Sequence, residues 1–388
     1  MELSRLIKDK EIKDFDILKN ILEVEPYNLK IKEDTNYPNL FLIHNNDNSD
    51  LTLKIVNECN GIILDKNTLK IVCYTFDKSD NSVDLSENLD KNNLFFEYSI
   101  EGTLMRLFYY ENNWIFSTKK CIDASKARWL SEKNFIELFM ECIINFDIFS
   151  KLDKNSCYSF IITHPENNIV VQNITPFLYH ISTRNMSTLE EYEDSIGITK
   201  LEKSKIEKEN LPNILTHILN DTSLFYEGYI FIDNKYNRWK IKTPIFNKVR
   251  ALWGNSNNRF FRYLELRKDT DLLQEYLKYF PNDRLKFVPY EIKINDFANI
   301  LLSAYVNKHI TKVNNTLPYY FVKIVYKLHG DYLKDRIVTD NNKVMLTLLN
   351  LDAKLLCFLI NSHDKYISQS NKMETEEDKD NDNTLNVV

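Results

Sequence analysis

Short runs of apolar and β-branched residues between about Tyr37 and Lys242 constrain the fold of this chain most strongly. Polar turn clusters such as HNNDN and YENNW separate these runs, and helical stretches interrupt them around Ser131–Phe149 and Leu189–Leu219. The runs that we interpret as strands are NLFLIH, GIILD, LKIVCYTF, LMRLFYY, NWIFSTK, CYSFIITH, NIVVQN, EGYIFID and RWKIKT. Because strands and helices do not alternate regularly, the pattern predicts an α+β fold and not a series of βαβ units.

The hydrophobic period changes to a helical one from about Asp271. Three apolar stripes at helical spacing begin near Leu272, near Phe297 and, just after Pro318, at Phe321. They predict a small all-helical C-terminal domain. We therefore expect a first domain over residues 1–268, a helical domain over 269–368, and a disordered acidic tail over 369–388, which has almost nothing to bury.

Composition narrows the class of protein. The hydrophobic fraction of 43% and the aromatic fraction of 13% predict a packed core. No apolar run approaches the roughly 20 residues of a membrane span, and the N-terminal residues lack the apolar core of a signal peptide. Six scattered cysteines form no C-x-x-C pair and seven histidines show no metal-ligand spacing. We expect reduced thiols, a cytoplasmic location and no membrane partner.

Charge is distributed unevenly along the chain. The net charge is -6. Residues 373–382 carry -5 of it, because this segment contains six acidic residues and one lysine. Residues 238–268 hold nine basic residues and one acid, and we assign four of them to a nucleic-acid surface: Lys248, Arg250, Arg259 and Arg262. Aromatic residues in the same window either stack on bases or belong to the core. The acidic tail is a solubilising extension or, alternatively, a mimic of RNA that covers this basic segment.

Five short segments in one order carry the chemical signal. They are Tyr98-Ser99-Ile100-Glu101-Gly102-Thr103, the run from Phe160 to Val171, Glu227-Gly228-Tyr229-Ile230, Trp239-Lys240-Ile241-Lys242 and, upstream, Glu58-Cys59-Asn60-Gly61. The first four resemble motifs of the covalent nucleotidyltransferases, which comprise DNA ligases, RNA ligases and mRNA capping enzymes. The upstream segment is similar to the E-C-R-G segment of phage T4-type RNA ligases.

The resemblance extends from about Tyr37 to Asp283 and, more weakly, through the helical domain. The run from Ser117 to Ala124, which includes Lys119, sits where the T4-type group has its lysine-bearing strand, and residues 244–268 look like the RNA-ligase-like proteins of large DNA viruses. The resemblance implies a nucleotidyltransferase domain of antiparallel sheets with flanking helices. It also implies ATP or GTP and Mg²⁺ as cofactors, RNA or a nucleotide as ligand, and a possible protein assembly partner.

In that family a first-motif lysine attacks the α-phosphate of the nucleotide. A fourth-motif glutamate helps to bind a divalent metal, and fifth-motif lysines neutralise charge on the transferred phosphoryl group. Carried over residue by residue, Glu101 and Glu227 match catalytic positions, and Glu227 also matches a metal ligand. The positions that match nucleotide-binding residues are Gly102, Lys119, Lys240 and Lys242. The nucleophile does not match, because Ser99 stands where the lysine belongs and no lysine lies between Lys91 and Lys119.

Two further positions depart from the family pattern, since Asn60 replaces an arginine and Ile161 a glutamate that many members carry. Loss of the first-motif lysine at Ser99 and of the arginine at Asn60 would together weaken nucleotide binding by roughly 3 to 6 kcal/mol. We therefore expect a catalytically degenerate homologue that binds nucleotide or RNA ends. The alternatives are an active ligase that uses a displaced lysine, such as Lys119 or Lys240, and a protein-interaction scaffold. His164 is interpreted as a hydrogen-bonding residue at a strand end.

Overall fold

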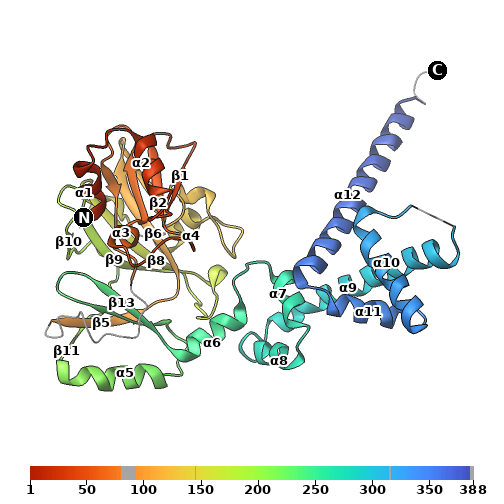
Figure 1. Cartoon of the computed structure of the whole chain (residues 1–388). Helices are drawn as coiled ribbons and strands as arrows, with labels where there is room; N and C mark the ends of the chain where they lie inside the picture. The colour runs from red at the N-terminus through yellow and green to blue at the C-terminus, as the bar shows by residue number, and fades with distance from the viewer. Residues whose placement is uncertain (80–92, 145, 314–315, 385–388) are drawn as a thin grey trace. The chain divides into compact units, whose positions relative to one another are not determined.

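The chain divides into two compact units, Met1–Arg250 and Ala251–Val388 (Figure 1). The computed structural model describes residues 1–79, 93–144, 146–313 and 316–384, and its described side chains end at residue 369. The boundary expected at residue 268 therefore lies inside the second unit. The reason is α7 (Arg259–Leu266), which buries Tyr263, Leu264 and Leu266 and packs against the helices of that unit.

Three antiparallel sheets form the first unit, as the α+β interpretation requires. The first sheet contains, in spatial order, β1 (Lys30–Glu33), β2 (Leu40–His44), β3 (Asn60–Asp65) and β4 (Ile71–Cys73). The second contains β10 (Glu191–Tyr192), β9 (Phe177–Asn185), β8 (Ser156–Thr163), β6 (Thr103–Tyr110) and β7 (Asn113–Thr118). The third contains β11 (Ser204–Ile206), β5 (Leu94–Ser99), β12 (Gly228–Ile232) and β13 (Arg238–Lys242).

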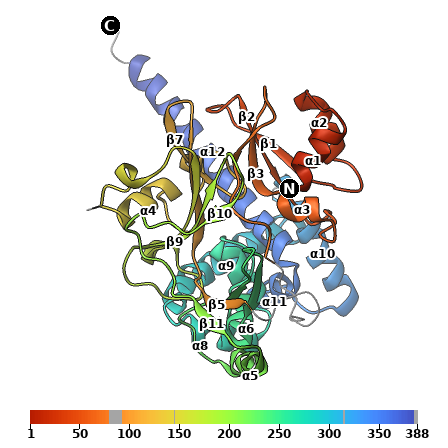
Figure 2. The same ribbon diagram turned by 90° about the vertical axis from the view of Figure 1, so that its left-hand side faces the viewer.

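Successive residues of a buried strand belong to different core clusters on the two faces of its sheet, which explains how these sheets pack. Leu40, Leu42 and Ile63 of the first sheet share a core cluster with Phe108 and Ile115 of the second, so these two sheets lie face to face. Helices cover the remaining apolar faces (Figures 1 and 2). They are α1 (Glu2–Asp9), α2 (Phe15–Leu22) and α3 (Lys54–Glu58) on the first sheet, α4 (Phe135–Cys142) on the second and α5 (Leu211–Asn220) on the third.

The second unit is helical. The three predicted stripes fall in α8 (Thr270–Tyr279), α9 (Asp283–Tyr305) and α10 (Tyr319–Asp335), so the prediction of a helical C-terminal region is confirmed. The remaining helices are α11 (Asn341–Asn350) and α12 (Ala353–Thr384), and α6 (Pro244–Trp253) spans the boundary between the units. Most of the segment expected to be disordered, residues 369–388, continues α12 as far as Thr384, and residues 385–388 lie outside the described residues.

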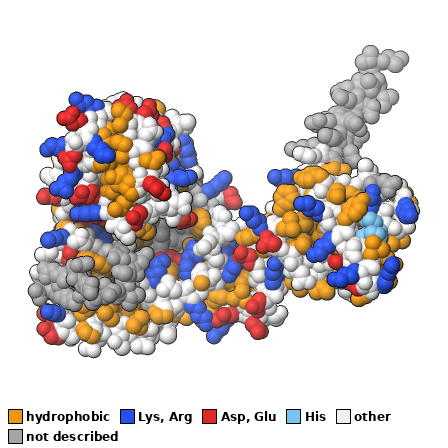
Figure 3. All heavy atoms as spheres, viewed as in Figure 1, with side chains coloured by type: hydrophobic (Ala, Val, Ile, Leu, Met, Phe, Trp, Pro, Cys, Tyr) orange, Lys and Arg blue, Asp and Glu red, His pale blue; other side chains and the backbone are white. Residues whose placement is uncertain are grey.

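The surface of the second unit is partly apolar. Leu285, Val338 and Tyr319 are each more than 70% exposed, and Figure 3 shows apolar side chains gathered on the face of this unit that is in view. Among the described residues, no helix has both the length and the apolar character that a membrane span requires. The six cysteines are free.

Two expected elements are wrong. NIVVQN is not a strand but a loop, in which Val170 and Val171 bury their side chains while their N–H groups bond to a carboxylate. The helix expected over Leu189–Leu219 is limited to α5 at its end, because the preceding residues pair as β10 and β11 with β9 and β5. Strand pairing there overrides a sequence whose charged, lysine-rich composition favours a helix.

Candidate functional site: a polar cavity where three sheets meet

A cavity of about 300 Å³ lies inside the first unit where its three sheets approach one another. The third sheet contributes Glu97, Ser99 and Lys240, and the other two sheets contribute Asn60 and Leu104. Its complete lining is Asn60, Phe76, Lys78, Ser79, Glu97, Tyr98, Ser99, Ile100, Gly102, Leu104, Lys119, Ile161, Ile181, Leu201, Glu227, Ile230, Arg238 and Lys240. Five of the residues expected to form the site thus line one cavity: Ser99, Gly102, Lys119, Glu227 and Lys240.

Strand register in the third sheet explains why these residues meet. Gly228 of β12 lies between Ser99 of β5 and Lys242 of β13. Two residues further along β12, Ile230 lies between Glu97 and Lys240. Because side chains alternate between the faces of a strand, both rows point to the same face of the sheet. The spacing of the motifs therefore places their polar side chains together.

Glu227 is the centre of the polar contacts in the cavity. Its Oε2 accepts hydrogen bonds from Ser99 Oγ at 3.0 Å and from Lys240 Nζ, and its Oε1 accepts from Lys242 Nζ at 3.2 Å. Burial alone would raise the pKa of Glu227, but Lys240 and Lys242 reverse that effect and the pKa is lowered. A carboxylate with a lowered pKa is a weak base, so Glu227 is poorly suited to take a proton from Ser99.

These contacts also bear on the metal role expected for Glu227. A divalent cation prefers open carboxylate oxygens, and both oxygens of Glu227 already accept from ammonium or hydroxyl groups. Two lysines neutralise its charge. Glu227 as arranged here therefore does not fit the role of a metal ligand, and we derive no step through a metal held by this residue.

Two glycines in the motifs are required by close backbone approaches. A Cβ atom on Gly228 would lie 2.1 Å from the carbonyl oxygen of Ile241, and one on Gly102 would lie 2.4 Å from that of Ile162. No such contact fits between real atoms, so any larger residue would push the strands apart. Gly228 also leaves the space between Ser99 and Lys242 open, which allows both side chains to reach Glu227.

Lys119 follows β7 and is held in place through its backbone. The position of a Cβ on Gly61, whose φ is +94°, is only 2.6 Å from the Lys119 carbonyl oxygen, and Arg106 donates to the carbonyl oxygens of both Gly61 and Thr118. Burial, followed by repulsion from Lys240 and Arg106, lowers the pKa of Lys119 to about 8. Part of the Lys119 population thus carries a neutral amine near physiological pH.

Glu97 is a cavity residue that the sequence interpretation missed. It is 5% exposed, and burial raises its pKa to about 7 against the opposing effects of Lys203 and Arg238. Its position two residues before Ser99 on one strand was the available signal, because residues i and i+2 share a face. Asn60, which replaces an expected arginine, also lines the cavity, and its buried Nδ2 has no hydrogen-bond partner within the part of the chain that the structure describes.

The other expected site residues lie elsewhere. Glu101 does not line the cavity, because its Oε2 accepts from the Val170 and Val171 N–H groups at 2.8 and 2.7 Å. Lys248 and Arg250 belong to α6.

The two remaining members of the expected basic surface serve the second unit. Arg259 lies over the Trp253 ring at 3.6 Å and pairs with Asp283 at 3.2 Å. Arg262 donates to the Leu252 carbonyl oxygen and pairs with Glu265. Their side chains are only 15% and 13% exposed. This corrects the expectation that these two arginines face solvent, because they hold α6, α7 and α9 together.

A second group of ligand-type residues, Glu141, His164 and Glu166, gathers at the end of β8. His164 Nδ1 accepts from the Glu166 N–H at 3.2 Å, so its proton resides on Nε2, which lies 3.1 Å from Glu141. A metal needs a ring nitrogen with a free lone pair, and both ring nitrogens of His164 already take part in hydrogen bonds. The two carboxylates are also engaged, because Lys133 pairs with both Glu141 and Glu166. The group is therefore an ion-pair network, and the interpretation of His164 as a hydrogen-bonding residue is confirmed.

Comparisons with known proteins supply independent information. No protein-family model matches the chain. An "Immediate-early protein ICP-46 homolog" of Invertebrate iridescent virus 6 is 26% identical over 240 residues, which cover 55% of this chain and 53% of that protein. A "Putative bifunctional polynucleotide kinase/RNA ligase" of Autographa californica nuclear polyhedrosis virus is 23% identical over 322 residues, or 77% of this chain and 44% of that protein. The chain is thus similar to part of a putative viral polynucleotide kinase/RNA ligase.

The chain spans about half the length of the curated relatives it matches. Comparison with solved structures gives a putative ATP-dependent DNA ligase from Aquifex aeolicus, with a TM-score of 0.42 and 12% identity, covering 86% of this chain and 87% of that one. An archaeal ATP-dependent RNA ligase has a TM-score of 0.39 and 10% identity, covering 91% of this chain and 80% of that one.

Proposed function

We propose that the chain is a ligase-like nucleotidyltransferase homologue that binds a nucleotide, or the nucleotide at an RNA end, in the cavity between its sheets without forming a covalent intermediate. The observation that carries the proposal is the environment of Ser99, which occupies the position of the nucleophile and donates its hydrogen bond to Glu227. The similarity to a viral polynucleotide kinase/RNA ligase supports the ligand class.

The chemistry of the cavity favours binding over catalysis. Lys119, Lys240 and Arg238 provide positive charge for phosphate, and Leu104, Ile161 and Ile181 provide apolar surface for a base or ribose. Ser99 is a poor nucleophile unless a base takes its proton. The lowered pKa of Glu227 makes that carboxylate a weak base. A nucleotide phosphate would compete with Glu227 for Lys240 and Lys242. ATP or GTP is the proposed ligand class. Mg²⁺ would enter the cavity bound to the phosphates of the nucleotide.

One observation favours a second candidate function. The pKa of Lys119, lowered to about 8, is suited to an attacking amine. An active enzyme would use Lys119 Nζ to attack the α-phosphate, with a P–N bond formed, a P–O bond broken and pyrophosphate released. We rank this alternative second because Lys119 is held on a different sheet from the motif that normally carries the nucleophile.

Two measurements on the full chain separate these functions. Incubation with radiolabelled ATP or GTP and Mg²⁺, followed by denaturing electrophoresis, should leave no label on the protein, whereas a label that maps to Lys119 or Lys240 establishes the enzyme. Equilibrium binding under the same conditions should detect nucleotide and should weaken about tenfold or more in Lys240→Ala, which removes a charge-assisted contact. Lys151→Ala, on an exposed lysine outside the cavity, is the matched control. Failure to bind any nucleotide overturns the proposal and favours the scaffold function.

A further inference from the structure

A second cavity, which we call the basic pocket, lies beside the first within the same unit and has a volume of about 360 Å³. The two cavities share Phe76, Lys78 and Arg238 in their linings, so a ligand can extend from one to the other. Five cationic side chains line the basic pocket, together with the single carboxylate of Asp77: Lys54, Lys78, Arg184, Lys235 and Arg238. Nothing in the proposed function uses Lys54, Arg184 or Lys235.

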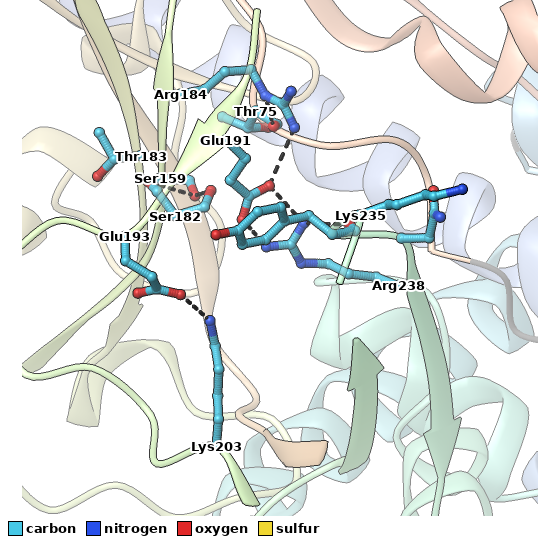
Figure 4. A network of polar contacts seen from close by, with 12 residues as sticks. Thr75, Ser159, Ser182, Thr183, Arg184, Glu191, Glu193, Lys203, Lys235 and Arg238 are labelled. Atoms are coloured by element: carbon cyan, nitrogen blue, oxygen red, sulfur yellow. Dashed lines mark hydrogen bonds and ion pairs between the residues drawn. The ribbon is translucent and has the colours of Figure 1, made fainter. Parts of the chain in front are cut away.

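The floor of the basic pocket is a buried charge cluster. Arg184 of β9 and Arg238 of β13 both pair with Glu191 of β10, so two guanidinium groups share one carboxylate (Figure 4). The Arg238 and Glu191 side chains are each 3% exposed. The buried Arg238 Nε has no hydrogen-bond partner among the residues that the structure describes. The floor therefore keeps excess positive charge and an unused donor.

The rim adds cations that pair with no carboxylate among the described residues. Within the described ranges, Lys54, Lys78 and Lys235 form no ion pair, and Lys54 and Lys235 are exposed. Asp77 accepts a hydrogen bond from Tyr74, a neighbour in the same wall. A buried guanidinium surrounded by flexible exposed lysines suits the phosphate groups of a strand that continues into solvent, because such contacts are electrostatic and tolerate different strand positions.

We infer that the basic pocket binds a backbone or terminal phosphate of a polynucleotide strand whose end nucleotide occupies the first cavity. This inference rests on the proposed function, which places a nucleotide in that cavity. The shared chemistry is a phosphate group, and it has two sources: an RNA strand or the triphosphate tail of a free nucleotide. We assign the phosphate to an RNA strand, because the exposed lysines at the rim extend the positive surface outward from the cavity.

The test measures fluorescence anisotropy of a short 5′-phosphorylated, 3′-labelled oligoribonucleotide on the full chain. The double variant Lys54→Glu/Lys235→Glu should bind it about tenfold or more weakly than the original chain, with a shallower dependence of log K on log salt by about 1.4, or about 0.7 for each lost contact. Lys30→Glu/Lys151→Glu changes the net charge equally at exposed sites outside both cavities and should change binding much less. Circular dichroism verifies that each variant is folded.

Binding of AMP and ATP to the same variants distinguishes the sources. If Lys54→Glu/Lys235→Glu binds both nucleotides with unchanged affinity, the pocket binds the phosphate of a strand. If this variant loses affinity for ATP alone, the pocket binds the triphosphate tail, and the assignment to a strand is overturned. Equal loss in both double variants, or no loss in either, overturns the pocket as a phosphate site. If Lys54→Glu/Lys235→Glu weakens binding of the oligoribonucleotide but Lys240→Ala in the first cavity does not, the proposed function fails while the basic pocket stands as a phosphate site.

Discussion

At the scale of single residues, the cavity places a buried serine within a network of charged side chains. Ser99 is 1% exposed and bonds to Glu227, which also binds Lys240 and Lys242. Sequence motifs predicted that Ser99, Glu227 and the two lysines would meet, because strand register fixes the positions of residues in paired strands. They did not predict Glu97, because a buried carboxyl next to a motif has no distinctive sequence pattern.

Ser99→Lys should restore covalent nucleotidylation if the rest of the cavity is intact. The new amine would lie in the cavity beside Glu227 and Lys240, and would supply the nitrogen nucleophile that a P–N bond requires. Radiolabelled ATP with Mg²⁺ should then mark the protein on a denaturing gel. Ser99→Met, of similar length but without an amine, should remain unlabelled. If Ser99→Lys still binds ATP but acquires no label, the cavity lacks more than its nucleophile.

Nucleotide binding should weaken as pH rises from about 6 to 9. Glu97, with its pKa raised to about 7, is neutral below that pH and adds a negative charge above it. Lys119, with its pKa lowered to about 8, is a cation below that pH and loses its charge above it. Both changes disfavour an anionic ligand in the same direction. Isothermal titration with ATP should show the decline, and Glu97→Gln should remove its lower part while Lys119→Met removes the upper part. A flat profile would contradict both assignments.

At the scale of elements, the sequence predicted strands well where apolar alternation is uninterrupted and failed where pairing depends on distant residues. The segments of β2, β3, β6, β7, β8, β12 and β13 were all expected. NIVVQN has the sequence of a strand because three consecutive residues in it are β-branched and apolar, but the N–H groups of Val170 and Val171 bond to Glu101 instead of a neighbouring strand. The edge strands β10 and β11 are short and polar, and only their partners β9 and β5 define them.

Gly228→Ala should destabilise the first unit by roughly 1 to 3 kcal/mol, because its Cβ would overlap the Ile241 carbonyl oxygen in β13. The displacement would also separate Ser99 from Lys242 across β12 and reduce nucleotide affinity. Gly330→Ala is the matched control, because this exposed glycine lies inside α10 and, apart from the backbone of its own helix, no described atom lies within 4 Å of the position that its Cβ would take. Alanine there should stabilise the helix by about 0.5 to 1 kcal/mol. Thermal unfolding followed by circular dichroism measures both, and equal effects would contradict the close-approach argument.

At the scale of the whole molecule, the helical unit was predicted from its apolar stripes, but its start was not. The basic window 238–268 was interpreted as one surface, whereas its residues divide between β13, α6 and α7 and belong to both units. A lysine or arginine in sequence gives no indication of whether its charge meets solvent or an internal carboxylate. Arg259 forms an ion pair with Asp283, and Arg262 forms one with Glu265. These two basic residues therefore hold helices together instead of forming part of a basic surface.

The division into units predicts that the fragment Met1–Arg250 folds and retains the nucleotide site. Every residue that lines the cavity and the basic pocket precedes Arg250. Phe246 and Val249 stay within the fragment, whereas Trp253 packs edge-to-face against Phe280 and would be left exposed if it were retained. The fragment should therefore bind ATP within about threefold of the full chain, a difference of less than about 1 kcal/mol, and should unfold cooperatively. A fragment that folds but loses ATP binding would show that the helical unit contributes directly to the site.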